Sequence, residues 1–150
     1  MAVHYFDKHA QEGNRLIAQL AQEIGDAEDT NKAVRILKVV LHTLRDRLTV
    51  QESFQLMAQF PLFLRGVYVA EWKYRSEPLR IRHAEEFIGQ VSIRDRSAEQ
   101  DFVNVERSTF LIKKVFKVVG QYVSAGEWQD VLDNLPQQLH PLVAPALSTE

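Results

Sequence analysis

Apolar residues recur along this chain at intervals of three and four, the spacing of one face of an α helix. Strand-like alternation is absent over any useful length, and the six glycines and five prolines leave long runs uninterrupted. We therefore predict an all-α protein. The clearest apolar stripe lies in a helix predicted at about residues 31–48, and its members are Leu37, Val40, Leu41, Leu44 and Leu48.

Four helices are predicted in the first half of the chain. The first spans about residues 5–24, and a polar run separates it from the second, at about 31–48. The third begins at Thr49, because Thr49 and Glu52 have the spacing of a capping box, in which each side chain accepts the other residue's backbone amide hydrogen. Pro61 begins a short fourth helix, where a first-turn proline loses no hydrogen bond.

The same pattern returns 75 residues later, where residues 108–142 align with residues 33–67 without a gap. Ser124 and Glu127 repeat the capping box, and Pro136 repeats the helix-starting proline. The two segments agree in their apolar stripe, in their helix caps and in their helix breakers, and this agreement indicates an internal repeat. We predict two tandem four-helix repeats packed as one compact helical domain over residues 1–150, with repeat one at about 5–68, a link at 69–82 and repeat two at about 83–145.

The second repeat departs from the first in three places. It has four extra residues in the loop around residues 97–101. Pro141 replaces Gly66, a different helix breaker at the same position. Trp128 stands where the first repeat has Ser53, which predicts either an asymmetric contact or an exposed anchor for a partner.

Four features follow one another in the first half: an arginine-rich helix end, a helix-starting threonine, a proline turn and an aromatic segment ending in tryptophan. They lie in LKVVLHTLRDRLTVQESFQLMAQFPLFLRGVYVAEW, which precedes RHAEEFIGQV. In order and spacing they resemble the bacterial family catalogued as domain of unknown function 2267, over nearly the whole chain. The resemblance implies an all-helical, two-repeat protein of the bacterial cytoplasm and no particular activity. The family often has glycine before the tryptophan, where this chain has Glu71.

Composition narrows the classes of chemistry. The chain has no cysteine, which excludes disulfides, thiolate nucleophiles and sulfur-ligated metal sites, and which suits a reducing cytosol. The first ten residues do not resemble a secretory signal, and no stretch approaches the ~20 apolar residues of a membrane-spanning helix. We expect a cytoplasmic protein without a membrane partner. The net charge of −2 indicates no particular partner.

No nucleophile elbow, phosphate loop or dinucleotide fingerprint occurs in the sequence. His4 with Asp7, and His83 with Glu86, have the helical spacing of two metal ligands, but neither pair is doubled. We therefore predict no catalytic residue, no cofactor and no metal, and we expect a protein that is not an enzyme.

One face of the second predicted helix is basic and lies opposite its apolar stripe, with Arg35, Lys38, His42 and Arg45. Lys113 and Lys117 occupy two of the equivalent positions in repeat two. Stacked repeats would align the two stripes as a track for phosphates. An ordinary solvated helix face is the simpler interpretation, and the acidic net charge favours it.

The link interleaves aromatic and basic residues, with Trp72 and Tyr74 among Lys73, Arg75, Arg80 and Arg82. Such a segment can stack on bases or anchor a protein partner. Alternatively, Trp72 fills the seam between the repeats while the arginines stay in water, and we favour this position for Trp72.

Two classes of function remain, with a third behind them. Docking of a protein partner, or self-association into a homo-oligomer, is favoured because stacked helices mainly offer surface. Nucleic-acid binding through the basic stripes and the link is the alternative. An enzyme with an unrecognised site is the third possibility.

Overall fold

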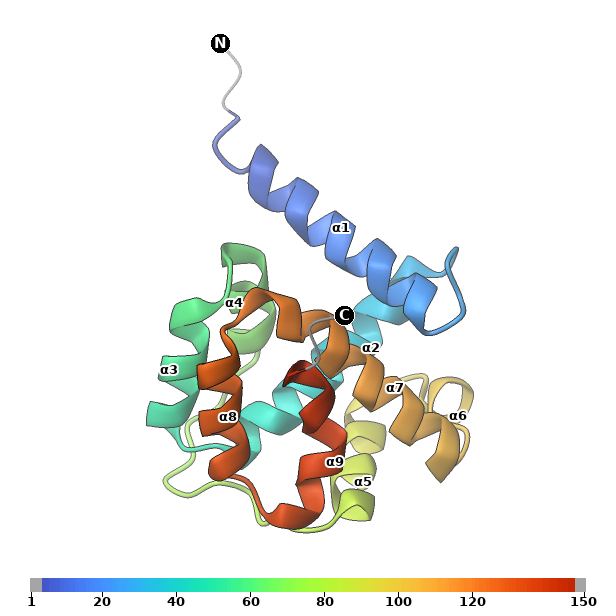
Figure 1. Cartoon of the computed structure of the whole chain (residues 1–150). Coiled ribbons are helices and arrows are strands. Elements are labelled where there is room, and N and C mark those ends of the chain that lie inside the picture. The colour runs from blue at the N-terminus through green and yellow to red at the C-terminus, as the bar shows by residue number, and fades with distance from the viewer. Residues whose placement is uncertain (1–3, 148–150) are drawn as a thin grey trace.

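The computed structural model describes residues 4–147, and all regular structure in this range is helical (Figure 1). The all-α prediction is confirmed. Within these residues, no helix is both long and apolar enough to cross a membrane. The α helices are α1 (Asp7–Glu23), α2 (Thr30–Arg47), α3 (Val50–Gln59), α4 (Leu62–Val69), α5 (Ala84–Arg94), α6 (Ala98–Asp101), α7 (Val105–Val119), α8 (Ala125–Asp133) and α9 (His140–Val143). Three 3₁₀ turns join them, η1 (Gly120–Tyr122), η2 (Gln137–Leu139) and η3 (Ala144–Leu147).

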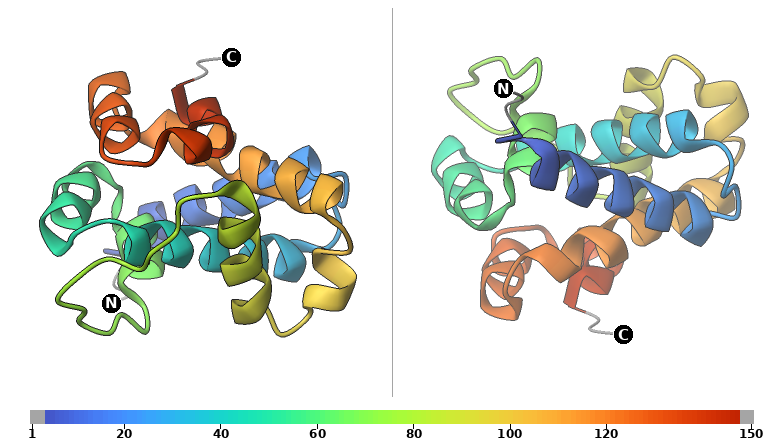
Figure 2. Two further views of the ribbon diagram at one scale, coloured as in Figure 1. Left: turned by 90° about the horizontal axis from the view of Figure 1, so that it is seen from below. Right: turned by 90° about the horizontal axis from the view of Figure 1, so that it is seen from above.

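Helices α2 and α7 form the centre of the molecule. They contact each other, α1 packs across both, and α5 contacts both from another side (Figure 2). Side chains from both halves of the chain join in one hydrophobic core. The two predicted apolar stripes lie in this core, with every member at most 8% exposed: Leu37, Val40, Leu41, Leu44, Leu48, Ile112, Val115, Phe116, Val119 and Val123.

The first predicted capping box is complete, and the second is half-formed. Thr49 N donates to Glu52 Oε1 at 2.7 Å, and Glu52 N donates to Thr49 Oγ1 at 3.1 Å. Ser124 Oγ accepts from Glu127 N at 3.2 Å, but Ser124 N donates to Gln59 Oε1 at 2.9 Å. Because α3 and α8 lie side by side (Figure 1), Gln59 takes the position that Glu127 was predicted to occupy. The prediction of a complete second box is therefore wrong.

The closing helices of the two halves differ in continuity. Helix α4 begins after Pro61 and runs through Gly66 without a break. In the second half, η2 is followed by the separate short helix α9, with Pro141 near its start. Proline has no backbone N–H, so the hydrogen bond that would join the two turns cannot form. The predicted core leucines, Leu64 and Leu139, are both fully buried.

The element starts keep the spacing seen in the sequence. Helices α2, α3 and α4 begin 75 positions before α7, α8 and η2, respectively. The extra residues of the second half contain the short helix α6. The two-repeat arrangement and its boundaries stay predictions.

Between α4 and α5 the chain crosses the surface without a helix, over residues 70–83 (light-green loop in Figure 2). Leu79 N donates to Asp46 O at 2.8 Å, and Arg47 Nε donates to Ile81 O at 3.0 Å, so the link is tied to the end of α2. Glu71, at the start of the link, has a φ of 60°. This left-handed backbone favours glycine, which is the residue that the family resemblance implies there.

Candidate functional site

The basic face of α2 is largely covered, because the end of α4 and the start of the link lie on it. Arg45 is 4% exposed, and its Nη1 donates to Tyr68 O at 2.9 Å and to Ala70 O at 2.8 Å. His42 is 7% exposed, its Nε2 donates to Val67 O at 2.7 Å, and burial lowers its pKa. The prediction of a solvated basic face opposite the apolar stripe is wrong for these two residues.

The other two members of the stripe are paired with carboxylates. Arg35 donates from Nη2 to Asp101 Oδ1 at 3.1 Å and from Nε to Asp101 Oδ2 at 3.2 Å. This hydrogen bonding raises the pKa of Arg35. Lys38 pairs with Glu71, and that contact lowers the pKa of the Glu71 carboxyl. The left-handed residue of the link is therefore held by the basic face of α2.

Asp46 joins α2 to the end of α5. Its Oδ1 accepts from Arg45 Nε at 3.1 Å, and its Oδ2 lies 2.7 Å from Arg94 Nη1. A buried carboxylate shared by two guanidinium groups is a rigid, charge-assisted junction.

A cleft of about 630 Å³ lies between α2, the link and the end of α5. Its charged lining comprises seven cations and three carboxylates: Arg35, Lys38, Arg45, Lys73, Arg75, Arg94 and Arg96, with Asp46, Glu71 and Asp95. Ion pairs hold four of the cations. Among the described residues, Lys73, Arg75 and Arg96 form no ion pair, and all three are exposed. We call these three the free cations of the cleft.

A buried pair of acids lies at one end of the cleft. Asp95 Oδ1 accepts from Ser97 N at 3.0 Å, whereas its buried Oδ2 has no hydrogen-bond partner among residues 4–147. Burial, followed by the proximity of the Asp101 carboxyl, raises the pKa of Asp95 to about 6. Burial acts to raise the pKa of Asp101, but the neighbouring Asp95 and the hydrogen bonds from Arg35 outweigh it and lower that pKa. The two shifts together favour a proton on Asp95 beside an ionised Asp101.

Trp72 packs within the first half of the chain. Its ring meets Phe54 and Tyr68 edge-to-face, at centroid distances of 6.0 and 6.1 Å, and the Arg45 guanidinium carbon lies 5.6 Å from the ring centre. These partners belong to α2, α3 and α4, so the ring does not lie in the favoured position, a seam between the repeats. Trp72 packs within the first half because Phe54 of α3 and Tyr68 of α4 lie next to the start of the link.

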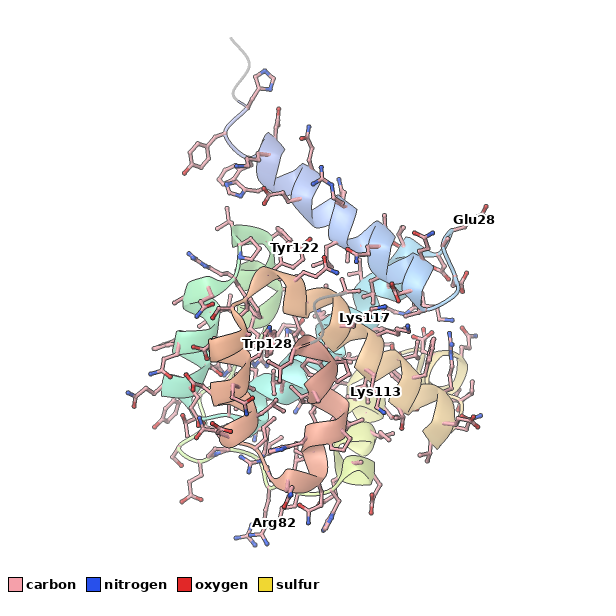
Figure 3. The ribbon with its side chains drawn as sticks, viewed as in Figure 1. Glu28, Arg82, Lys113, Lys117, Tyr122 and Trp128 are labelled. Atoms are coloured by element: carbon pink, nitrogen blue, oxygen red, sulfur yellow. The ribbon has the colours of Figure 1, made fainter. Side chains whose placement is uncertain are left out.

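The remaining aromatic and basic residues of the link differ in whether they line the cleft. Tyr74 is 82% exposed, and the neighbouring Arg75 lines the cleft. Arg80 is exposed and lies outside the cleft lining. Arg82, also outside the lining, lies at the lower edge of the molecule in Figure 3.

Trp128 is fully buried in α8, so the alternative of an exposed anchor is wrong (Figure 3). Its ring centre lies 6.3 Å from that of Phe116, and Nε1 donates to Gly120 O at 3.3 Å. In the first half, the aligned Ser53 is also buried and hydrogen-bonds to the Tyr68 hydroxyl at 2.8 Å. Trp128 in the second half therefore corresponds to Ser53 in the first half, which is small and has the aromatic Tyr68 as its partner.

The lysines of α7 take part in other contacts. Lys117 Nζ lies 3.2 Å from Glu23 Oε1, and Lys114 Nζ lies 3.0 Å from the same oxygen. These contacts lower the pKa of Glu23, Lys114 contributing most. Lys113 is half-buried on α7 (Figure 3) and does not line the cleft. The structure does not join the two predicted stripes, because Lys117 of α7 pairs with Glu23 of α1, whereas the basic residues of α2 face the link and the end of α5.

The two histidine–acid pairs have local contacts. His4 Nδ1 lies 2.7 Å from Asp7 Oδ2. Glu86 Oε1 accepts from His83 N at 3.0 Å and from Arg82 N at 3.1 Å, so Glu86 caps the start of α5. In the described part of the chain, no three histidine or acidic side chains are grouped to hold a metal ion.

Sequence reasoning missed the residues that α5 contributes to the cleft, although the sequence contains an indication of them. The tripeptide Arg-Asp-Arg occurs twice, at residues 45–47 and 94–96. Five of these six residues line the cleft, and Asp46 of the first tripeptide pairs with Arg94 of the second. Both tripeptides lie at helix ends, where a chain turns and two such ends can meet.

Comparison with known proteins identifies a matching protein family. The family model described as "Uncharacterized conserved protein (DUF2267)" matches residues 13–142. Among curated proteins, no relative matches the chain.

Proposed function

The chain belongs to the DUF2267 family of uncharacterised conserved proteins, and we propose that it is a non-catalytic binding module that docks an acidic segment of a partner protein in its cationic cleft. The observation that carries this proposal is the trio of free cations, Lys73, Arg75 and Arg96, on the rim of a concave site. We also propose a bacterial cytoplasmic location, which the absence of cysteine supports.

Charge and shape both support an anionic ligand. With His42 neutral, the lining carries a net charge of +4, on a chain whose net charge is −2. The volume of about 630 Å³ lies in the usual range of ligand sites, but those are mostly apolar, and this one is mostly charged. Carboxylates that approach the free cations gain charge-assisted hydrogen bonds, and the internally paired cations keep the cleft walls in place.

The test is a fluorescence anisotropy titration with a fluorescein-labelled peptide of alternating glutamate and glycine. The cleft variant carries Lys73→Gln, Arg75→Gln and Arg96→Gln, which remove the three free cations. The control variant carries Arg15→Gln, Arg80→Gln and Arg82→Gln, which remove the same charge from exposed positions outside the cleft. We expect the cleft variant to lose about tenfold or more in affinity, because each exposed charge contact contributes a few tenths of a kcal/mol or more.

The control variant should stay within about twofold of the unmodified protein. Equal losses in both variants would show attraction to net charge rather than a site, and the proposal would fail. Absence of binding at low salt would contradict it as well.

Nucleic acid is the second candidate, and one observation favours it: Tyr74 is 82% exposed beside Arg75, as in surfaces that stack unpaired bases. A labelled thymidine oligonucleotide in the same titration tests this candidate. Tighter binding of the oligonucleotide than of the peptide, with a steep salt dependence, would favour nucleic acid over a protein partner.

A further inference from the structure

A second, smaller cavity opens beside the cationic cleft. It has a volume of about 150 Å³ and lies between the start of α3 and residues 72–78 of the link. Leu48, Val50, Trp72, Tyr74 and Pro78 supply its apolar lining. We call it the side pocket.

The side pocket and the cleft share part of their lining, namely Arg45, Asp46 and Arg75. One ligand can therefore enter both, with a charged group in the cleft and an apolar group in the side pocket. Arg75 is one of the three free cations, so a carboxylate at the junction has a guanidinium group available to it.

The size of the side pocket suits one six-membered ring. A cavity of about 150 Å³ is large enough for a benzene molecule. A phenyl or phenol group therefore fits this volume. The apolar side chains form one part of the lining, which also includes Arg45, Asp46, Thr49, Arg75, Ser76 and Glu77.

Trp72 gives the side pocket an aromatic wall whose orientation suits such a ring. Trp72 is held edge-to-face by Phe54 and Tyr68, with the Arg45 guanidinium against it, so its orientation is fixed before a ligand arrives. Aromatic rings attract one another in edge-to-face and offset geometries beyond the effect of burial alone. Tyr74, at 82% exposed, can close over an incoming ring.

From these observations we infer that the acidic segment bound by the cleft carries a phenylalanine or tyrosine next to its carboxylates, and that this ring occupies the side pocket. The inference rests on the proposed function, and it names the chemistry of the partner segment. The ring fixes where the segment lies, and the free cations bind the acids that flank it.

The experiment compares two labelled eight-residue peptides of glutamate and glycine, identical except for phenylalanine or alanine at the centre. The phenylalanine peptide should bind roughly five- to tenfold more tightly, because part of the gain from burying a ring is lost to ordering it. Tyr74→Ala should weaken binding of the phenylalanine peptide more than binding of the alanine peptide, so that the preference falls to about twofold or less. Tyr74 is suited to the test because its side chain is 82% exposed, so its truncation removes little packing from the fold.

Tryptophan fluorescence gives an independent readout. The chain has two tryptophans, of which Trp128 is buried in the core and Trp72 lines the side pocket. The phenylalanine peptide should change the emission of the unmodified protein, and this change should vanish in Trp72→Phe.

Each outcome bears on the inference. Equal affinity for the two peptides would overturn the side-pocket assignment and leave the proposed function standing. Binding of neither peptide would overturn both. A thymidine oligonucleotide that binds more tightly than both peptides and alters Trp72 emission would place a base in the side pocket and overturn the peptide assignment.

Discussion

At the scale of single residues, Glu71 adopts the least favourable backbone conformation in the cleft lining. Its φ of 60° is costly for a residue with a Cβ, and glycine avoids this cost. Glu71→Gly should therefore raise the free energy of unfolding by about 0.5–1 kcal/mol, after allowance for the greater freedom of glycine in the unfolded chain. Urea denaturation at pH 7 measures this change.

The same substitution should also strengthen anion binding, because it releases Lys38 and removes a carboxylate from the cleft. Glu71→Gln is the matched control, since it removes the charge and keeps the strained backbone. It should increase affinity for the acidic peptide, as Glu71→Gly does, without increasing stability. A glycine variant less stable than the glutamine variant would contradict the role assigned to the backbone.

Asp95 makes stability depend on pH. Its pKa is raised from 3.8 to about 6, so the folded protein holds a proton there that the unfolded chain releases. Stability from this group is complete below about pH 4 and is lost as the pH rises through about 6. This group alone should lower the unfolding free energy by about 1–3 kcal/mol between pH 4.5 and 7, the range set by a shift of this size. His42, whose pKa burial lowers, acts in the opposite direction as the pH rises toward 6.5.

Asp95→Asn should remove the Asp95 contribution from the pH dependence, because an amide keeps an acceptor for Ser97 N and cannot ionise. Asp101, whose pKa is lowered, acts in the opposite direction only below about pH 4, outside this range. Urea titrations at several pH values provide the measurement, with the exposed Glu99→Gln as control. If the unfolding free energy of Asp95→Asn depended on pH as that of the unmodified protein does, Asp95 would not be a source of the pH dependence.

At the scale of elements, the end of α7 packs against η3 with no room for a side chain. A Cβ at Gly120 would lie 2.7 Å from Ala146 Cα, a contact with backbone that cannot move aside easily. Gly120→Ala should therefore lower the unfolding free energy by about 1–3 kcal/mol. Thermal unfolding followed by circular dichroism measures this effect.

Gly126 provides the matched control, because a Cβ there meets no atom within 4 Å and the residue lies in α8. Gly126→Ala should raise stability by about 0.5–1 kcal/mol through helix propensity alone. If both variants shifted the midpoint equally, the close packing of α7 on η3 would not be the cause.

Helix type and position were predictable because they depend on local signals. The apolar stripes, the Thr49–Glu52 box and the helix-starting prolines each act within a few residues, and each appears in the structure. The second capping box was mispredicted because a residue from another helix, Gln59, supplied the missing acceptor. Tertiary contacts of this kind leave no periodic trace in a single sequence.

At the scale of the whole molecule, the cleft depends on three segments that meet only after folding. The basic stripe of α2 was recognisable from its spacing, but its burial by α4 and the link was not. Arg94, Asp95 and Arg96 entered the site through the packing of α5 on α2. Of the two α7 lysines at the equivalent stripe positions, Lys117 pairs with Glu23 of α1, and Lys113 does not line the cleft.

The most direct test of the central claim is an NMR titration of the ¹⁵N-labelled protein with the glutamate–phenylalanine peptide. We expect the largest amide shift changes at residues 71–76 and 94–97, with residues 113–117 of α7 nearly unchanged. Shift changes centred on α7, or spread evenly over the basic surface, would contradict the assignment of the cationic cleft as the binding site.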